Sequence, residues 1–232
     1  MSTKSTKGSG SRNLTVKLKK SRGRSISSQR WLQRQLNDPY TQEAQRMGYR
    51  SRAAFKLLQI NEKYNIIKPN MRVVDLGAAP GGWCQILTQH IDTTKPGNEV
   101  LALDILEMEP MPGVTVMQMD FEDHDAPDQL KSKMSGPADL VLSDMAPPTT
   151  GHKNTDHLRI MSLVEMAYDF SEQIMAPGGT FVAKVFQGGT EQEILKRLKQ
   201  NFDKVHHFKP PSSRKDSSEM FVVALGFKKK ED

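Results

Sequence analysis

The chain has 232 residues, 36% of them hydrophobic, and a formal net charge of +6. This length predicts one domain with an appendage and is enough to bury a hydrophobic core. No apolar run approaches the roughly 20 residues of a membrane span, and the N-terminus lacks the hydrophobic centre of a secretory signal, so we expect a cytoplasmic protein without membrane contacts. The single cysteine, Cys84, cannot form an intramolecular disulfide and has no neighbours for a zinc site, so we expect no metal.

The positive charge is concentrated at the N-terminus. Residues 1–37 contain ten Lys and Arg and no acidic residue, which leaves the rest with 23 basic against 27 acidic residues, a net charge of −4. Residues 1–27 are rich in Ser, Gly and Lys, and we expect this arm to be disordered when free. It is either a solvated tail or a polybasic segment that neutralises phosphates of a nucleic acid; a membrane surface is the weaker third choice. The folded domain is expected over residues 28–232.

Two helices are predicted before the first strand. Residues 27–40, SSQRWLQRQLNDPY, indicate a short helix with Ser27 or Ser28 as its N-cap and Pro39 at its end. Residues 51–64, SRAAFKLLQINEKY, indicate a second helix that is capped by Ser51 and has Lys56 between its apolar positions.

From residue 71 onwards, short apolar runs alternate with helical patterns. The runs that we interpret as parallel strands, buried on both faces, are 71–77, 98–104, 114–120, 138–144 and 179–186. The longest helical pattern covers 155–175, and Pro177-Gly178-Gly179 supplies the break after it.

Two further strands are predicted near the end of the chain, at 204–210 and 219–227, and the last is expected to be antiparallel. Strands that alternate with helices predict an α/β fold of the doubly wound, Rossmann-like class. We therefore expect a seven-stranded, mostly parallel sheet with one antiparallel strand.

The segment VVDLGAAPGGWCQ, residues 73–85, lies where the first strand reaches the carboxyl edge of the sheet, at which open α/β sheets bind ligands. Its glycines, Gly77, Gly81 and Gly82, permit a tight turn and close approach of a ligand to the backbone. Asp104 closes the second strand, 22 residues beyond Gly82, where a carboxylate commonly accepts hydrogen bonds from ribose hydroxyls. An adenosine derivative is therefore expected, since the G-x-G-x-x-G order of nicotinamide cofactors and the phosphate-loop sequence are both missing.

Two more acidic residues end strands at this edge, Asp120 in VMQMDFED and Asp144 in VLSDMAPP. Either could be a capping aspartate without a chemical role. Asp144 is the stronger candidate, because the Pro-rich sequence after it turns the chain sharply away and leaves the carboxylate exposed to ligand and substrate.

The segments DLGAAPGGW, SDMAPP, KVFQG and SSRKDSSEMFVVA, with RSRAAFKL upstream, closely resemble the FtsJ-like family of S-adenosylmethionine-dependent ribosomal RNA 2′-O-ribose methyltransferases. They occur in the family's order and spacing over roughly residues 28–227, and only the basic arm looks less typical. The resemblance implies a catalytic tetrad of Lys56, Asp144, Lys184 and Glu219. It also implies that Gly81, Trp83, Asp104, Asp120 and Asp144 contact the cofactor.

The predicted topology brings the four tetrad residues together independently. Asp144 and Lys184 lie at or near the carboxyl ends of neighbouring parallel strands, and Glu219 begins an antiparallel strand whose start meets the same edge. The helix that carries Lys56 can cover this rim. An isolated lysine in a strand is more often one that reaches water from an edge strand, so the alternative for Lys184 is a solvated edge position.

The chemistry of ribose methylation explains a need for these residue types. A neutral hydroxyl is a poor nucleophile until its proton is removed, and Lys184 is our candidate base. Burial, a second ammonium at Lys56 and a positive sulfonium all favour a neutral amine, whereas Asp144 and Glu219 orient the lysines and limit their repulsion.

The sequence therefore predicts a monomeric enzyme that transfers a methyl group from S-adenosylmethionine to the 2′-hydroxyl of a uridine in large-subunit ribosomal RNA, within the assembled subunit. Methylation of transfer RNA or of an RNA cap is a same-class alternative. A noncatalytic RNA-binding factor for ribosome assembly is an alternative of another class, and the intact tetrad argues against it.

The remaining conspicuous residues have ordinary interpretations beside functional ones. Trp83 could pack in the core at the start of a helix rather than contact the cofactor, and Cys84 is expected to be a small buried side chain. Six cations near the tetrad segments could be solvated or could hold RNA phosphates: Arg46, Arg50, Arg52, Lys209, Arg214 and Lys215.

Overall fold

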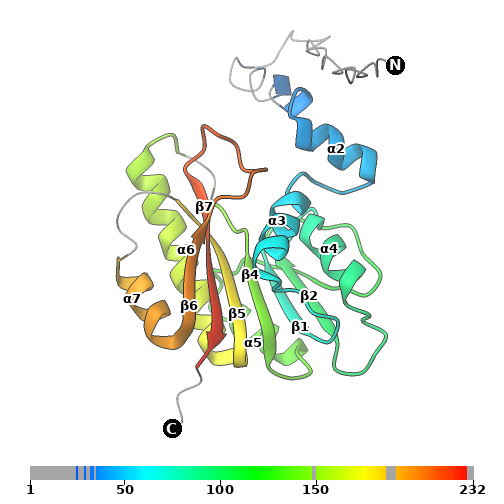
Figure 1. The fold of residues 1–232 in the computed structure, drawn as a ribbon, viewed down its shortest axis with the longest axis vertical. Helices are drawn as coiled ribbons and strands as arrows, with labels where there is room; N and C mark the ends of the chain where they lie inside the picture. Colours follow the sequence, from blue (N-terminus) through cyan, green and yellow to red (C-terminus); the bar gives the residue numbers. More distant parts are fainter. Residues whose placement is uncertain are drawn as a thin grey trace, which may run out of the picture.

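A twisted sheet forms the centre of the protein and separates two layers of helices (Figure 1). The computed structural model describes residues 35–147, 150–186 and 192–228, with Ser25, Gln29, Leu32 and Gln33 before them. Within these residues the sheet has seven strands in the order β3-β2-β1-β4-β5-β7-β6. The strands are β1 (Arg72–Leu76), β2 (Glu99–Asp104), β3 (Thr115–Gln118), β4 (Ala138–Ser143), β5 (Met175–Phe186), β6 (Phe202–Phe208) and β7 (Glu219–Phe227). The helices are α2 (Pro39–Met47), α3 (Ala54–Tyr64), α4 (Gly82–His90), α5 (Ala126–Lys133), α6 (Lys153–Ile174) and α7 (Gln192–Asn201).

Strand β7 is the antiparallel member of the sheet. It pairs antiparallel with β5 on one side and with β6 on the other, whereas β1, β2, β3, β4 and β5 pair parallel. The predicted doubly wound, mostly parallel sheet with one antiparallel strand is confirmed. Because β7 runs backwards, Glu219 at its start is paired with Phe186 at the end of β5 and lies at the carboxyl edge of the parallel strands.

Apolar stripes on the helices bury the two faces of the sheet. On one face, Leu57 of α3 and Leu87 of α4 pack in one core cluster with residues of β1 and β2. On the other face, Leu130 of α5, Tyr168 of α6 and Leu198 of α7 belong to a second cluster. The central strands are buried from both sides, which is why they read in the sequence as continuous apolar runs.

Pro39 follows one helix and begins the next. The described residues before it are helical at Gln29, Leu32, Gln33, Gln35 and Leu36, so the predicted short helix ends before Pro39 as expected, and α2 begins at Pro39 itself. The Asp38 side chain caps α2 by accepting hydrogen bonds from the backbone N–H groups of Tyr40 and Thr41 at 3.0 and 3.2 Å. Proline is tolerated in the first turn because its missing N–H would have no partner inside the helix. The predicted caps Ser27 and Ser28, and the arm 1–27 apart from Ser25, lie outside the described residues.

Two predicted boundaries were wrong. Helix α3 begins at Ala54 without a side-chain cap, and the Ser51 hydroxyl instead accepts a hydrogen bond from the Ala53 N–H in the preceding turn, at 3.3 Å. Strand β5 begins directly after α6: Met175 already pairs with Ala138, and pairing resumes at Thr180 after a register shift. The Pro-Gly-Gly sequence therefore forms an irregularity inside β5, not a separate break.

Gly77 allows the turn after β1 to approach the end of β4. Its backbone adopts φ +77°, and an added Cβ would lie only 2.7 Å from the Met145 backbone N. Its own N–H donates to the Leu103 carbonyl of β2 at 2.8 Å. Glycine is required here because the conformation is left-handed and because the neighbour is backbone, which cannot rotate away.

Gly77→Ala is expected to lower the free energy of unfolding by about 2–5 kcal/mol, through left-handed strain and the collision with Met145. Gly178→Ala is the matched control, since Gly178 has φ +81° but nothing within 4 Å of an added Cβ. Strain alone should cost the control about 1–2 kcal/mol. Urea denaturation of both variants checks this, and equal losses would show that the approach to Met145 is not a constraint.

Candidate active site

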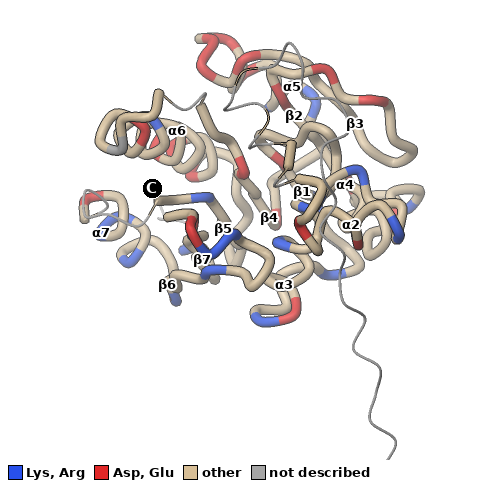
Figure 2. Tube along the Cα trace, turned by 90° about the horizontal axis from the view of Figure 1, so that it is seen from above, with Lys and Arg blue, Asp and Glu red and all other residues tan. Residues whose placement is uncertain are grey.

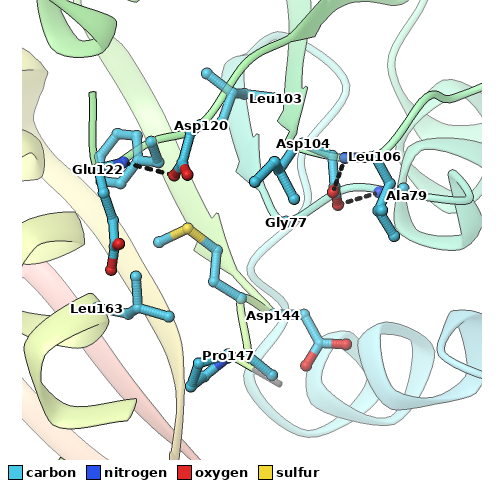
Figure 3. A pocket seen from close by; sticks show the side chains of 14 residues that line it. Gly77, Ala79, Leu103, Asp104, Leu106, Asp120, Glu122, Asp144, Pro147 and Leu163 are labelled. Atoms are coloured by element: carbon cyan, nitrogen blue, oxygen red, sulfur yellow. Dashed lines mark hydrogen bonds between the residues drawn. The ribbon is translucent and has the colours of Figure 1, made fainter. Parts of the chain in front are cut away.

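The turn between β1 and α4 and the loop after β2 form two walls of a site at the carboxyl edge of the sheet. Asp104 joins them, because its Oδ2 accepts a hydrogen bond from the Ala79 N–H and its Oδ1 accepts one from the Leu106 N–H, both at 2.8 Å. Figure 3 shows this carboxylate turned towards both backbone groups. Asp104 therefore fixes the spacing of the two walls, whatever else it binds.

Arg50 clamps the same walls from outside. Its Nη1 donates to the carbonyls of Glu109 at 2.7 Å and Pro80 at 3.2 Å, and its Nη2 donates to the Pro110 carbonyl at 2.9 Å. The planar, five-donor guanidinium is suited to holding several acceptors at once. Arg50 is thus committed to the protein itself, which favours a structural role over the phosphate contact that the sequence left open.

A cavity of about 350 Å³ opens between these walls and the end of β4 (Figure 3). Acidic side chains from three strand ends line it, namely Asp104, Asp120 and Asp144, together with the exposed apolar side chains of Ile105 and Leu106. The full lining is Gly77, Ala79, Leu103, Asp104, Ile105, Leu106, Asp120, Phe121, Glu122, Asp144, Met145, Ala146, Pro147 and Leu163. Three of the five residues predicted to bind a cofactor therefore lie together.

Gly81 and Trp83, the other two, are not among the lining residues. Trp83 is buried, donates through Nε1 to the Ala53 carbonyl at 2.8 Å, and packs against Phe221 with ring centroids 5.8 Å apart. These contacts, with the N-cap residue of α3 and with β7, match the core interpretation of Trp83. Direct contact of Gly81 or Trp83 with the cofactor stays a prediction. Sequence reasoning missed Ile105 and Leu106, whose only signal was a pair of apolar residues directly after Asp104.

The four predicted catalytic residues form a continuous ion cluster beside this cavity. Lys56 Nζ lies 2.8 Å from Glu219 Oε2 and 3.4 Å from Asp144 Oδ2. Lys184 Nζ lies 3.0 Å from Asp144 Oδ1 and donates to the Asp144 backbone carbonyl at 2.5 Å. Lys184 is 7% exposed and its strand lies between β4 and β7, so the edge-strand interpretation of this lysine was wrong.

The cluster holds Lys56 and Asp144 in their charged forms. Burial disfavours the charge on Lys56, but the carboxylates of Asp144 and Glu219 outweigh burial and hold the pKa of Lys56 above its ordinary value. Burial likewise opposes ionisation of Asp144, whereas Lys184 and Lys56 outweigh it and hold the pKa of Asp144 below its ordinary value. An ammonium and a carboxylate that shift each other in these directions are both ionised near neutral pH.

A second cavity, of about 510 Å³, lies on the other side of the cluster. Its residues come from α3 and the chain before it, from the turn after β1, and from the loop between β6 and β7 with the start of β7. They are Gln35, Ser51, Arg52, Ala53, Lys56, Ala79, Pro80, Ser213, Arg214, Asp216, Ser217 and Glu219. The two cavities share Ala79, and Asp144 of the first is ion-paired with Lys56 of the second. A ligand in each would meet at the tetrad.

The cations around the second cavity differ in how much they are already bound by other groups of the protein. Arg52 is paired with Asp38 and donates to the Ser212 carbonyl, while Lys209 donates to the carbonyls of Lys215 and Ser217. Arg46 is paired with Glu43 on the surface of α2. Arg214, 3.7 Å from Asp38, and the exposed Lys215 are therefore the stronger candidates for phosphate contacts.

Within the described residues, no cluster of His, Cys, Asp and Glu side chains has the arrangement of a metal site. The helices in this part of the chain also include none that is long and apolar enough to cross a membrane.

Comparison with known proteins gives concordant results. The model of the FtsJ-like methyltransferase family matches residues 49–227. A protein of Paramagnetospirillum magneticum named ribosomal RNA large subunit methyltransferase E is 60% identical over 221 residues, which cover 94% of this chain and 91% of the relative. The protein of the same name from Parvibaculum lavamentivorans is 58% identical over 94% of this chain and 89% of its own. A crystal structure of a Plasmodium falciparum protein described as a ribosomal RNA methyltransferase matches with a TM-score of 0.68 and 32% identity, over 77% of this chain and 98% of that one.

A fully buried carboxyl group lies beneath the site, at Asp75 on β1. Burial raises the pKa of Asp75 from 3.8 to about 7, with smaller contributions from Asp144 and Asp104, and the hydrogen bond from the Cys84 thiol at 3.3 Å opposes the shift. Burial also raises the pKa of that thiol, so Cys84 stays protonated and inert, as expected. The folded protein therefore retains a proton on Asp75 that the unfolded chain has already released.

This proton makes stability fall as pH rises between about 4 and about 7, because the unfolded chain binds fewer protons there, and the slope approaches about 1.4 kcal/mol per pH unit. Asp75→Asn resembles the protonated acid and should remove this contribution. We expect the variant to gain stability relative to the wild type between pH 5 and pH 7, measured by urea denaturation. Parallel stability profiles of the two proteins would contradict the assignment.

Proposed function

The chain belongs to the FtsJ-like methyltransferase family, and on this premise we propose that it transfers a methyl group from S-adenosylmethionine to the ribose 2′-hydroxyl of a uridine in large-subunit ribosomal RNA. Two relatives named for large-subunit ribosomal RNA methylation, 60% and 58% identical over 94% of the chain, support this substrate. We further propose that the target is presented in the assembled subunit and that the enzyme acts in the cytoplasm as a monomer.

The observation that carries the proposal is the meeting of two cavities at the Lys56–Asp144–Lys184–Glu219 cluster. A methyl transfer needs a donor and an acceptor that approach in line at one point. The first cavity would hold the donor and the second would hold the nucleotide. The ion cluster lies between them, where the hydroxyl must lose its proton.

The residues of the first cavity fit S-adenosylmethionine. Asp104 and Asp120 supply carboxylate acceptors at adjacent strand ends, as a ribose and an amino group require, and Ile105, Leu106 and Phe121 supply apolar surface for a planar ring. Each oxygen of Asp104 accepts one backbone N–H and retains a second lone pair for a ligand. The bound cofactor would supply a methyl group on a positively charged sulfonium.

Lys184 is proposed to accept the proton of the 2′-hydroxyl. Lys184 Nζ donates to the Asp144 carbonyl and is ion-paired with the Asp144 side chain. The ammonium must first lose one proton, and the neutral amine then has a lone pair that can accept the hydroxyl proton. Asp144 therefore aims the lysine, while Lys56 and Glu219 complete the charge balance from α3 and β7.

The distribution of charge favours an approach of RNA from the side of α2, α3 and β7. Residues 104–128, which form the far wall of the first cavity and the start of α5, contain eight acidic residues and no Lys or Arg. Figure 2 shows acidic residues gathered near α5, β2 and β3, and Lys and Arg around α2, α3 and β7. Phosphates are repelled by the acidic wall and attracted to the opposite side, where the second cavity opens.

Lys184→Ala is expected to retain cofactor and RNA binding and to lose about 10²–10⁴-fold in the rate of methyl transfer, because a positioned base contributes that much. Lys184→Arg should be nearly as slow, since a guanidinium keeps the charge but cannot accept a proton at working pH. Single-turnover transfer of labelled methyl groups from S-adenosylmethionine to large ribosomal subunits lacking the modification measures both variants.

Lys63→Ala is the control, because Lys63 lies on the same helix as Lys56 but lines neither cavity. A wild-type rate for Lys184→Arg would remove Lys184 from the role of base and leave it only an electrostatic one. If the wild-type protein binds the subunit and transfers no methyl group, the enzyme proposal fails and the noncatalytic alternative takes its place.

The N-terminal arm is proposed to bind RNA phosphates. Residues 1–25 carry eight Lys and Arg, and their removal should weaken binding to ribosomal RNA and flatten its dependence on salt, since fewer counterions are released. Cofactor affinity should not change. A full-length variant with these eight residues replaced by Gln separates charge from length, and salt slopes equal to the wild type would make the arm a passive tail.

A further inference from the structure

The loop between β6 and β7 is held against α3 by its backbone. The Ser212 N–H donates to Gln59 Oε1 at 2.9 Å, and the Ser212 carbonyl accepts a hydrogen bond from Arg52. Further along the loop, Lys209 Nζ donates to the Ser217 carbonyl at 2.6 Å. These contacts fix the loop next to Glu219 without using the hydroxyl groups of Ser212 or Ser213.

The Ser213 hydroxyl is directed at the catalytic cluster. Its Oγ donates to Glu219 Oε1 at 2.7 Å, and the residue is 6% exposed. The other oxygen of that carboxylate, Oε2, accepts a hydrogen bond from Lys56 Nζ at 2.8 Å. Each oxygen of Glu219 thus has its own side-chain donor, and the two donors together fix the rotation of the carboxylate.

This rotation matters because Lys56 is shared. Lys56 Nζ lies 2.8 Å from Glu219 and 3.4 Å from Asp144 Oδ2, so it is bound more closely to Glu219. Asp144 can then turn its Oδ1 to Lys184, at 3.0 Å. If Glu219 rotates, Lys56 is free to move towards Asp144 and to compete with Lys184 for that carboxylate.

We propose that Ser213 is a positioning residue for methyl transfer: its hydroxyl fixes the Glu219 carboxylate, which draws Lys56 away from Asp144 and leaves Asp144 to orient Lys184. The inference rests on the proposed function. Ser213 lines the second cavity, but its single hydroxyl hydrogen is directed at Glu219, so it acts through that residue and not as a donor to the substrate.

The neighbouring residue provides a matched control. Ser212 lies in the same loop and is fully buried, and its hydroxyl has no hydrogen-bond partner among the described residues. Ser212→Ala and Ser213→Ala remove the same atom from adjacent positions and leave the backbone contacts of the loop in place. Only the second removes a bond to Glu219.

The test measures single-turnover methyl transfer and substrate affinity with S-adenosylmethionine and unmodified large subunits. Ser213→Ala should lower the rate of transfer about tenfold, the size expected for a hydrogen bond to a charged acceptor, with the affinities for cofactor and subunit changed less than about twofold. Ser212→Ala should keep the wild-type rate. Ser213→Thr, which retains the hydroxyl, should restore most of the activity, and Ser213→Cys, with a weak S–H donor, should not.

A double-mutant cycle tests whether the hydroxyl acts through Glu219. In a Glu219→Ala background, the further change Ser213→Ala should have almost no effect on the rate. An undiminished tenfold loss in that background, a loss confined to subunit affinity, or equal rates for Ser212→Ala and Ser213→Ala would each overturn the inference. If Ser213→Ala does not fold, the comparison of Ser213→Thr with Ser213→Cys decides it. An inactive wild-type protein would instead overturn the proposed function.

Discussion

The arrangement of the candidate site depends on two ammonium groups and two carboxylates that share one partly buried place. The set carries no net charge, and its side chains are only 8–15% exposed to solvent; its members are Lys56, Asp144, Lys184 and Glu219. Each is costly there alone, because breaking a buried pair leaves an uncompensated charge. The cluster is therefore stable only as a set, and the fold must deliver all four groups to one edge.

The antiparallel strand β7 allows all four side chains to lie at the same edge of the sheet. Parallel strands β4 and β5 bring Asp144 and Lys184 to their carboxyl ends, and the reversed direction of β7 brings Glu219 to the same edge at the beginning of a strand. Helix α3 then covers the rim and adds Lys56 from an earlier part of the chain. The carbonyl of Ala53, the N-cap residue of this helix, accepts a hydrogen bond from the Trp83 side chain, and Arg50 just before it holds both walls of the first cavity. The two cavities are thus joined by the segment from residue 50 to residue 56.

The elements that the sequence predicted well are those fixed by local patterns. Short apolar runs, four of them ending at or near an acidic residue or a glycine, located the five parallel strands β1 to β5, and their alternation with helices determined the fold class, because parallel strands must be covered on both faces. The errors lie where a residue has two permitted roles. Ser51 can cap a helix or accept a hydrogen bond in the turn before one; here its hydroxyl accepts the Ala53 N–H, and α3 begins at Ala54 without a side-chain cap. The sequence left the roles of Arg50 and Arg52 open between solvated charges and phosphate ligands, because their partners are carbonyls and a carboxylate that only the folded chain brings near. Ser213 lies in a segment that carries the family resemblance, but the sequence assigned it no role, since its proposed role comes from a 2.7 Å contact with a residue six positions away across a turn.

The neutrality of the resting cluster also bears on how a lysine could act as a base. At rest, two carboxylates balance two ammonium groups, and the raised pKa of Lys56 shows how strongly the carboxylates favour positive charge. A sulfonium in the first cavity would add one positive charge next to Asp144, so the site would carry an excess of +1. Loss of one proton restores the balance. Lys56, paired with both carboxylates, is the poorer candidate to lose it, whereas Lys184 is ion-paired, among the described residues, with Asp144 alone. In the proposed reaction, cofactor binding therefore prepares the base, and the methyl acceptor loses its proton only when the donor is in place.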